Sequence, residues 1–213
     1  EHNDETRPVF MAEATDKQAP IIFAQDTPLF TGKESSAHYD IYHDTPYGAL
    51  HAELRGYCQE KNVNTLLHAI GELQRIGYTI SEKAVHEAFA QVCQLTGLRG
   101  RWQQLHEAPR LICDTGHNIG GFQYIVPQIL AQPCRQLRIV FGMVNDKDIT
   151  SVIAMLPRHA QYYFTQASVA RALPAQTRSA RRSTLSRTAT PTLSSRAAQR
   201  LLSQDSLSRA SRT

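Results

Sequence analysis

Residues 111–121 read LICDTGHNIGG, and this stretch predicts the fold class. An apolar run ends in Asp114, a small polar turn follows, and His117 and Asn118 then precede paired glycines. A strand that ends in a glycine-rich turn before a helix is typical of folds in which strands and helices alternate. Ligands bind beyond the carboxyl ends of such strands, so Asp114, His117 and Asn118 are candidate ligand contacts.

The alternation continues after this stretch. Apolar strand patterns and helical patterns alternate at residues 110–114, 122–130, 137–143, 149–156 and 160–167. Strands that alternate with helices predict right-handed crossovers and a largely parallel sheet, so we expect an α/β fold. The turn before the second of these helices carries Lys147 and Asp148, which lie at another predicted strand end.

The first half of the chain has a different pattern. We expect a helix at the start, a buried strand at residues 21–24, short strands near residues 38–43 and 48–54, and helices at residues 62–73 and 81–95. Ser81 suits the N-cap of the last helix, and Gly77 suits the C-terminal end of the helix before it.

Between the two halves lies a loop with Gly100, Arg101 and Trp102. A guanidinium in such a loop can bind a phosphate or a carboxylate with two parallel hydrogen bonds. The simpler alternative is a solvated arginine beside a core tryptophan. The triplet at Asp114 also matches the aspartic protease signature, but that class needs two such carboxylates in an all-β fold, and the chain has one triplet and many helical segments.

The net charge of +4 is unevenly distributed. Residues 177–213 hold eight Arg, no Lys and one acid, a local charge of +7, whereas the remaining residues hold 15 bases and 18 acids, a net charge of −3. The body of the protein therefore has no basic footprint for nucleic acid. Residues 177–213 contain nine Ser and six Thr and no Val, Ile or aromatic residue, so we expect disorder there. Their abrupt start is typical of a shifted reading frame; a genuine basic arm is the alternative.

Several classes of protein and site are disfavoured. No apolar run is long enough to span a bilayer. The four cysteines have no CxxC spacing, and we expect reduced, mostly buried thiols and a cytoplasmic location. The nine histidines form no zinc motif. The chain contains neither GxxxxGK[ST] nor GxGxxG, so it holds no phosphate loop of its own.

Taken together and in order, six segments resemble the folylpolyglutamate synthase/dihydrofolate synthase family of the Mur ligase superfamily. They are ETRPVF with APIIFA (5–10 and 19–24), LRGYCQEKNVNTLLHAI (54–70), TGLRGRWQ (96–103), CDTGHNIGG (113–121), VFGMVNDKDI (140–149) and FTQASVARALPA (164–175). The resemblance implies ATP-dependent addition of L-glutamate to dihydropteroate or a folate through an acyl phosphate, with ATP and Mg²⁺ as cofactors.

The resemblance also implies site residues. Asn62, Arg101 and Asp114 match positions that contact ATP, and His117 matches a catalytic position at the phosphate and glutamate end of the cleft. Asn118, Lys147 and Asp148 match positions that line or support the substrate site. The Mg²⁺ ligands, the phosphate loop and the pterin-binding loops would all precede residue 1.

The implied organisation has three parts. Residues 1–97 resemble the C-terminal part of a P-loop-type ATP-binding central domain, and residues 98–176 a truncated Rossmann-like C-terminal domain with a mainly parallel sheet, before the basic tail. We expect a monomer that is inactive by itself. Two alternatives are a non-catalytic nucleotide-binding module with a basic arm and the C-terminal domain of a peptidoglycan Mur ligase.

Overall fold

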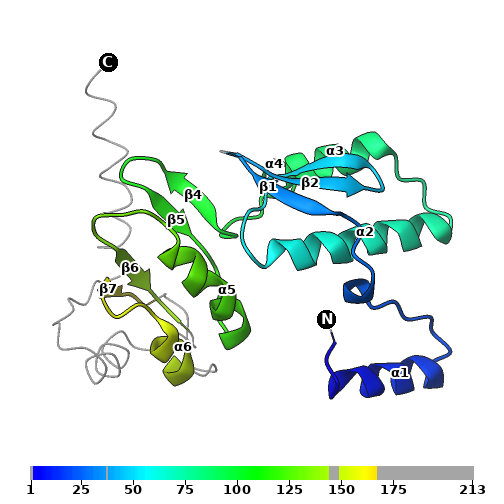
Figure 1. The fold of residues 1–213 in the computed structure, drawn as a ribbon, viewed down its shortest axis with the longest axis horizontal. Coiled ribbons are helices and arrows are strands. Elements are labelled where there is room, and N and C mark those ends of the chain that lie inside the picture. Colours follow the sequence, from blue (N-terminus) through cyan, green and yellow to red (C-terminus); the bar gives the residue numbers. More distant parts are fainter. Residues whose placement is uncertain (1, 37, 144–148, 167–213) are drawn as a thin grey trace. The chain divides into compact units, whose positions relative to one another are not determined.

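The computed structural model describes residues 2–36, 38–143 and 149–166 (Figure 1). The chain divides into two compact units, Glu1–Thr115 and Gly116–Thr213. The β hairpin at residues 103–113, which follows the expected domain boundary at residues 97/98, is grouped with the first unit. That domain boundary remains a prediction. The expected sites Lys147 and Asp148, most of the segment at 164–175 and the basic tail at 177–213 lie outside the described residues.

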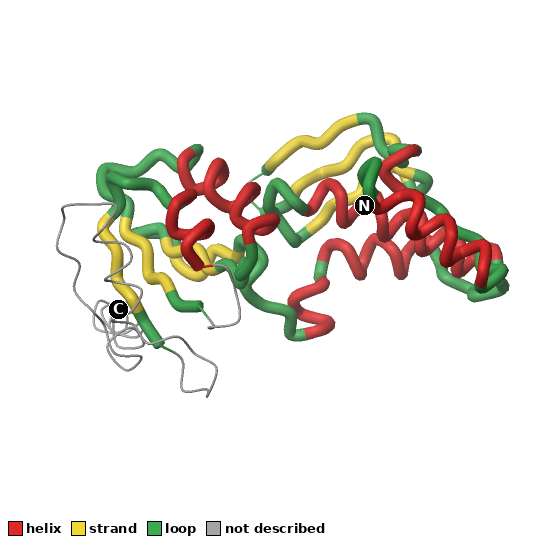
Figure 2. The backbone as a smooth tube through the Cα atoms, turned by 90° about the horizontal axis from the view of Figure 1, so that it is seen from below, coloured by secondary structure: helices red, strands yellow, loops and turns green. Residues whose placement is uncertain are grey.

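The first unit combines a three-stranded antiparallel sheet with helices. Its elements are α1 (Thr6–Asp16), the 3₁₀ turn η1 (Ala24–Asp26), β1 (Gly32–Ser35), β2 (Asp40–Thr45), β3 (Gly48–Ala52), α2 (Gln59–Arg75), α3 (Glu82–Ala90) and α4 (Val92–Thr96). The strand order is β1-β2-β3, and Tyr42 of β2 stands opposite Leu50 of β3. Figure 2 shows the strands of this unit as a layer beside its helices.

The core of the first unit lies on one face of this sheet. Alternate residues of β2 and β3 are buried there, together with side chains from α2 and α3: Tyr42, Leu50, Ala52, Val63, Leu67 and Val85. Side chains two positions apart in a strand point to the same face, and those four apart in a helix share a side. The spacing of these apolar residues in the sequence therefore places them all in the core. Asn64 of α2 anchors the loop between η1 and β1, since its Oδ1 accepts a hydrogen bond from the Leu29 amide at 2.8 Å.

Two expectations for this unit are wrong. Residues 21–23 are not in a strand, and η1 begins at Ala24; Ile22 is 51% exposed, and in the described part of the chain no segment pairs with it. The expected helix at residues 81–95 is broken at Gln91, whose φ of −134° lies outside the helical range. The helix after this break, α4, is anchored to the residue that follows β3, because the Cys93 amide donates a hydrogen bond to Glu53 Oε2 at 2.8 Å.

A second, two-stranded sheet closes the first unit. It consists of β4 (Gln103–His106) and β5 (Leu111–Cys113), which pair antiparallel, with Gln103 opposite Cys113. We expected β5 in a parallel sheet with the strands that follow it. It pairs instead with β4, because a short connection brings two neighbouring segments into a hairpin.

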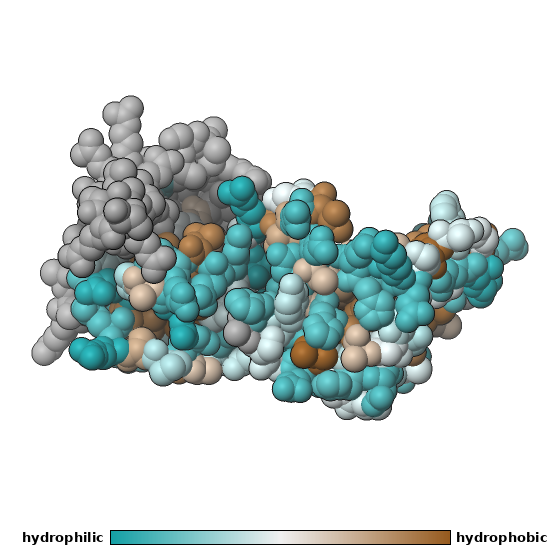
Figure 3. Space-filling view, turned by 90° about the horizontal axis from the view of Figure 1, so that it is seen from above, coloured by the Kyte–Doolittle hydropathy of each residue, from teal (hydrophilic) through white to brown (hydrophobic). Residues whose placement is uncertain are grey.

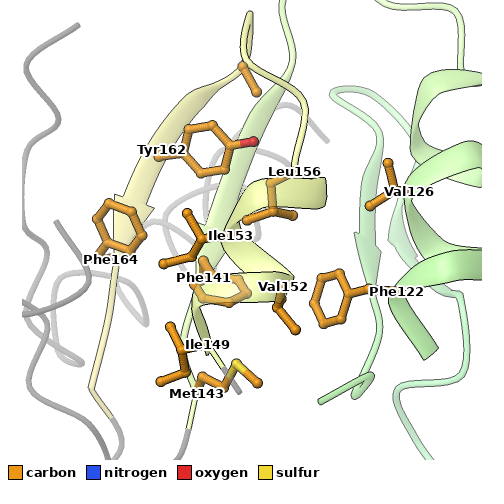
Figure 4. Close-up of a cluster of buried hydrophobic side chains, with 11 residues drawn as sticks. Phe122, Val126, Phe141, Met143, Ile149, Val152, Ile153, Leu156, Tyr162 and Phe164 are labelled. Carbon is orange, nitrogen blue, oxygen red and sulfur yellow. The ribbon is translucent and has the colours of Figure 1, made fainter. Parts of the chain in front are cut away.

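The second unit contains α5 (Ile119–Leu130), β6 (Arg138–Phe141), α6 (Ile149–Met155) and β7 (Gln161–Phe164). Here the prediction of parallel strands is confirmed, since β6 and β7 pair in parallel with Phe141 opposite Phe164. Figure 4 shows side chains of α5, α6 and both strands pointing toward one another in a common apolar core. Phe141 packs edge-on against both Phe122 and Phe164.

The surface gives two further observations. Figure 3 shows hydrophilic residues over most of the visible described face, with hydrophobic residues in small separate groups. Within residues 2–36, 38–143 and 149–166, no helix combines the length and the apolar character that crossing a membrane requires.

Candidate functional site

The candidate site begins where the β4–β5 hairpin ends. Because Gln103 stands opposite Cys113, the residues just outside this pair lie at the same end of the sheet: Arg101 and Trp102 precede β4, and Asp114 follows β5. The Asp114 carboxylate accepts a hydrogen bond at Oδ2 from the Trp102 amide at 2.8 Å. This contact holds Trp102 at a φ of +48°, a conformation that few residues other than glycine adopt.

Gly100 and Thr115 extend the same connection. The Thr115 amide donates to the Gly100 carbonyl at 2.9 Å, and the Thr115 hydroxyl donates to that carbonyl at 3.0 Å. The Arg101 guanidinium donates from Nη1 to the Thr115 hydroxyl oxygen at 2.5 Å. Arg101 thus lies in a loop that is fastened at three successive residues to the segment after β5, and its side chain is largely exposed to solvent.

The first turn of α2 carries the third candidate ATP contact. Asn62 is exposed, and its amide nitrogen donates to Gln59 Oε1 at 3.0 Å. Gln59 is only 5% exposed, and its own amide nitrogen contacts the Cys58 sulfur at 3.8 Å. The orientation of the Asn62 amide is therefore set by a buried neighbour one turn earlier.

Electrostatics relate α2 to the hairpin end within the first unit. Burial raises the pKa of the Cys58 thiol, the negative charge of Asp114 raises it further, and the positive charge of Arg101 opposes both. The Cys58 thiol, which directly precedes α2, therefore lies within electrostatic range of Asp114 and Arg101. Asn62 follows Cys58 by one helical turn, so it lies one turn from a thiol on which the charges of Asp114 and Arg101 both act.

A buried ionic cluster supports this start of α2. Asp40 is 2% exposed and accepts hydrogen bonds from Ser35 Oγ at 2.8 Å and from Lys33 Nζ at 3.4 Å. Lys33 also pairs with Glu60 of α2 at 2.9 Å. Burial lowers the pKa of Lys33, but Glu60 and Asp40 outweigh it and the pKa is raised. The charged Lys33 therefore ties β1 to the first turn of α2.

His117 and Asn118 belong to the second unit. Asn118 is the N-cap of α5: its backbone is extended, and its Oδ1 accepts a hydrogen bond from the Gly121 amide at 2.7 Å. His117 is exposed and directly precedes this cap. Asn118 therefore has a local structural role at the start of α5, whereas Asp114 holds the Trp102 amide.

Two residues of the site were not found from sequence. Thr115 fixes Arg101 through contacts between segments that are distant in sequence, which no local pattern reveals. The sequence does indicate that Gln59 is buried, since it lies four and eight residues before Val63 and Leu67 on the buried side of α2. Across residues 2–36, 38–143 and 149–166, no group of three or more His, Cys, Asp or Glu side chains is placed to hold a metal ion.

Curated proteins and solved structures of one enzyme type resemble this chain. No protein-family model matches the chain. The dihydrofolate synthase/folylpolyglutamate synthase of Escherichia coli K12 is 34% identical over 89 residues, which are 41% of this chain and 20% of that protein. The enzyme of the same name from Buchnera aphidicola is 28% identical over 97 residues, 45% of this chain and 22% of that protein. The chain resembles the dihydrofolate synthase/folylpolyglutamate synthases.

Solved structures of folylpolyglutamate synthases share the fold. The Mycobacterium tuberculosis enzyme complexed with ADP has a TM-score of 0.76 at 19% identity, over 94% of this chain and 45% of that one. A bifunctional folylpolyglutamate synthase/dihydrofolate synthase with Mn, AMPPNP and L-glutamate bound has a TM-score of 0.53 at 23% identity, over 80% of this chain and 39% of that one. The chain therefore spans about a fifth of the curated relatives by sequence and less than half of these structures.

Proposed function

We propose that this chain supplies the C-terminal portion of an ATP-dependent ligase that joins L-glutamate to dihydropteroate or a folate. The similarity to dihydrofolate synthase/folylpolyglutamate synthases supports the reaction class. One structural observation supports the proposal: the loop that carries Arg101 is fastened to Asp114 and Thr115 at the end of the β4–β5 hairpin. The family resemblance implies Asn62, Arg101 and Asp114 as ATP contacts.

Each of these side chains has the chemistry that a nucleotide requires. In the proposed site the Arg101 guanidinium offers positive charge and paired donors to a phosphate oxygen. The Asn62 amide offers both a donor and an acceptor to a base or ribose. The Asp114 carboxylate shapes the loop through Trp102 and adds an acceptor for a hydroxyl group. His117 is proposed as the catalytic residue beside the reacting phosphate and glutamate.

The reaction requires charge neutralisation along its course. A substrate carboxylate takes the γ-phosphoryl group of ATP, the amine of glutamate displaces phosphate from the acyl phosphate, and an amide, ADP and phosphate result. A divalent cation supplies further positive charge at such a phosphoryl group. The described residues of this chain present no cluster for that cation, so no metal ligand is assigned to them.

Nucleotide binding is the direct test of the proposal. The full chain, labelled with ¹⁵N, is titrated with ADP while the Asn62 side-chain amide, the Arg101 Nε–H and the Trp102 amide are followed by NMR. We expect a saturable shift of these signals. Arg101→Ala should weaken binding by about tenfold or more, because a hydrogen bond to a charged group contributes about 1.5–3 kcal/mol.

Arg99→Ala is the matched control, because Arg99 is exposed and its replacement removes the same charge two residues away. This variant should bind ADP nearly as the parent chain does. A parent chain without a shift, or equal weakening in both variants, would contradict the proposed nucleotide site.

A second experiment concerns activity. The chain has no phosphate loop, so the triphosphate lacks the cradle that aligns it for transfer. We expect no ADP release above background when the purified chain is incubated with ATP, Mg²⁺, glutamate and either dihydropteroate or tetrahydrofolate. Turnover would show that the chain by itself is a complete enzyme. The three-part domain assignment, the monomeric state and the cytoplasmic location stay predictions.

A further inference from the structure

We propose that Thr115 is a positioning residue that holds the Arg101 guanidinium in place at the nucleotide site; this inference rests on the proposed function. Three polar contacts and one steric contact join Thr115 to the residues at Gly100 and Arg101. The Gln103 side chain contacts Gly100, and Asp114 contacts Trp102, whereas Thr115 reaches both Gly100 and Arg101. Thr115 is therefore the side chain that couples the glycine backbone to the guanidinium.

The hydroxyl group is what allows Thr115 to serve both neighbours. A hydroxyl has one hydrogen to donate and two lone pairs to accept with. The Thr115 hydroxyl donates its hydrogen to the Gly100 carbonyl, which leaves the lone pairs for the Arg101 Nη1 hydrogen. The donation to Gly100 therefore fixes the direction in which the hydroxyl accepts from Arg101.

The methyl group of Thr115 has a separate task. A Cβ placed on Gly100 would lie 2.5 Å from Thr115 Cγ2, so the methyl group packs directly over the glycine. This close contact limits χ1 of Thr115, and a fixed χ1 also fixes where the hydroxyl lies. Both branches of the β-branched side chain thus contribute to one geometry.

The arginine gains from such a tether because its free side chain has many rotamers. Ordering an arginine side chain costs conformational entropy, because its several rotatable bonds lose their freedom. A guanidinium that Thr115 already holds loses less conformational entropy when it binds a phosphate. Loss of the hydroxyl should therefore weaken ADP binding even though Thr115 need not touch the nucleotide.

Two variants separate the two branches. Thr115→Val keeps the shape over Gly100 and removes the hydroxyl, whereas Thr115→Ser keeps the hydroxyl and removes the methyl. Each full-length variant is examined by two NMR readouts. The first needs no ligand: it is the hydrogen exchange and the Nε–Cζ rotation of the Arg101 guanidinium. The second is the dissociation constant for ADP, with the dispersion of the amide spectrum as the check of folding.

We expect faster guanidinium exchange and rotation in Thr115→Val, with ADP binding about three- to tenfold weaker, since the tether is a hydrogen bond to a charged group. Thr115→Ser should keep the slow guanidinium signal and most of the affinity. An unchanged Arg101 signal in a folded Thr115→Val chain would overturn the tether. A changed signal with unchanged ADP affinity would overturn the positioning role. A parent chain that fails to bind ADP would contradict the proposed function and the positioning role with it, while the guanidinium signal would still decide whether the tether exists.

Discussion

At the scale of single residues, two glycines in the loop before β4 have the same conformation but different surroundings. Gly97 has a φ of +71°, and a Cβ added there would meet no atom within 4 Å. Gly100 has a φ of +73°, and a Cβ added there would lie 2.5 Å from Thr115 Cγ2. The pair therefore separates the backbone requirement for glycine from the steric one.

Gly97→Ala should lower the free energy of unfolding by about 1–2 kcal/mol, the usual cost of the left-handed conformation for a residue with a Cβ. Gly100→Ala should cost clearly more, since the methyl group of Thr115 must also move. Urea unfolding followed by the fluorescence of Trp102, the one tryptophan of the chain, measures both. Equal losses would mean that the loop yields to the clash.

Asn118 gives a second residue-scale test. Its Oδ1 caps α5, and removal of a capping side chain costs about 1 kcal/mol. Asn118→Ala should therefore lower the protection of α5 amides against hydrogen exchange, whereas Asn118→Asp, which keeps the acceptor, should preserve it. Ser81→Ala provides the comparison, because Ser81 Oγ caps α3 through the Ala84 amide at 3.2 Å. Loss of protection in both Asn118 variants would contradict a purely capping role in stability.

Much of this residue-level structure was predictable where the signal is local. Ser81 is the N-cap of α3, and Gly77, with a φ of +105°, follows the end of α2 as expected. Local rules suffice there because a cap contacts residues only three or four positions away. Thr115 and the Asp114 contact to Trp102 were not predictable, because each joins residues more than ten positions apart.

At the scale of elements, sequence predicted long or strongly patterned segments and missed short polar ones. The helices α1, α2, α5 and α6 and the strands β2, β3, β6 and β7 were all expected. The strands β1 and β4 were not, because KES and QQLH show no apolar alternation and owe their form to a neighbouring strand. The same reason explains why Ile21 and Ile22 form no strand. Their apolar pattern favours a strand, but a stable strand also needs a partner strand.

The helix α1 illustrates an element that is held by charge rather than by burial. None of its residues is buried. It is joined to η1 through Asp26, which accepts from Arg7 Nη1 at 2.8 Å and forms a hydrogen bond with His2 at 2.8 Å, while Arg7 also lies over the Phe23 ring at 4.6 Å. The hydrogen bonds from His2 and Arg7 hold the pKa of Asp26 below its ordinary value.

The attachment of α1 should therefore depend on pH. A carboxyl group whose pKa is lowered by folding contributes stability that is fully present above the ordinary pKa, about 3.9, and is lost as the pH falls through the lower folded pKa. We expect amide protection factors in α1 to be constant from about pH 7 to pH 5 and to fall below about pH 4. In Asp26→Asn the protection should be lower and should show no such step. A step of equal size in this variant would assign the effect to another group.

At the scale of the whole molecule, the four thiols differ in their surroundings. Cys134 is exposed and Cys58, Cys93 and Cys113 are half-buried, whereas we expected mostly buried thiols. Burial raises the pKa of each of these three thiols, and the negative charges of Asp114 and Glu53 add to the effect. A raised pKa leaves less thiolate, which is the reactive form, at any given pH.

Alkylation with iodoacetamide near pH 8 should therefore modify Cys134 first and the other three several-fold more slowly. Peptide mass spectrometry over a time course measures each rate. In urea the four rates should become similar, because the unfolded chain removes the differences in burial. A folded chain in which Cys113 reacts as fast as Cys134 would contradict the described packing.

The Asp114 carboxylate, which fastens the Trp102 amide at the end of the β4–β5 hairpin, links two properties in one side chain. Its hydrogen bond holds a loop at a strained backbone angle, and its negative charge raises the pKa of the Cys58 thiol at the start of α2. Natural selection acting on either property also acts on the other. A lineage that lost the proposed nucleotide binding would still be under pressure to keep the aspartate for the loop. Persistence of this residue among descendants would therefore record the shape of the hairpin end as much as any ligand chemistry.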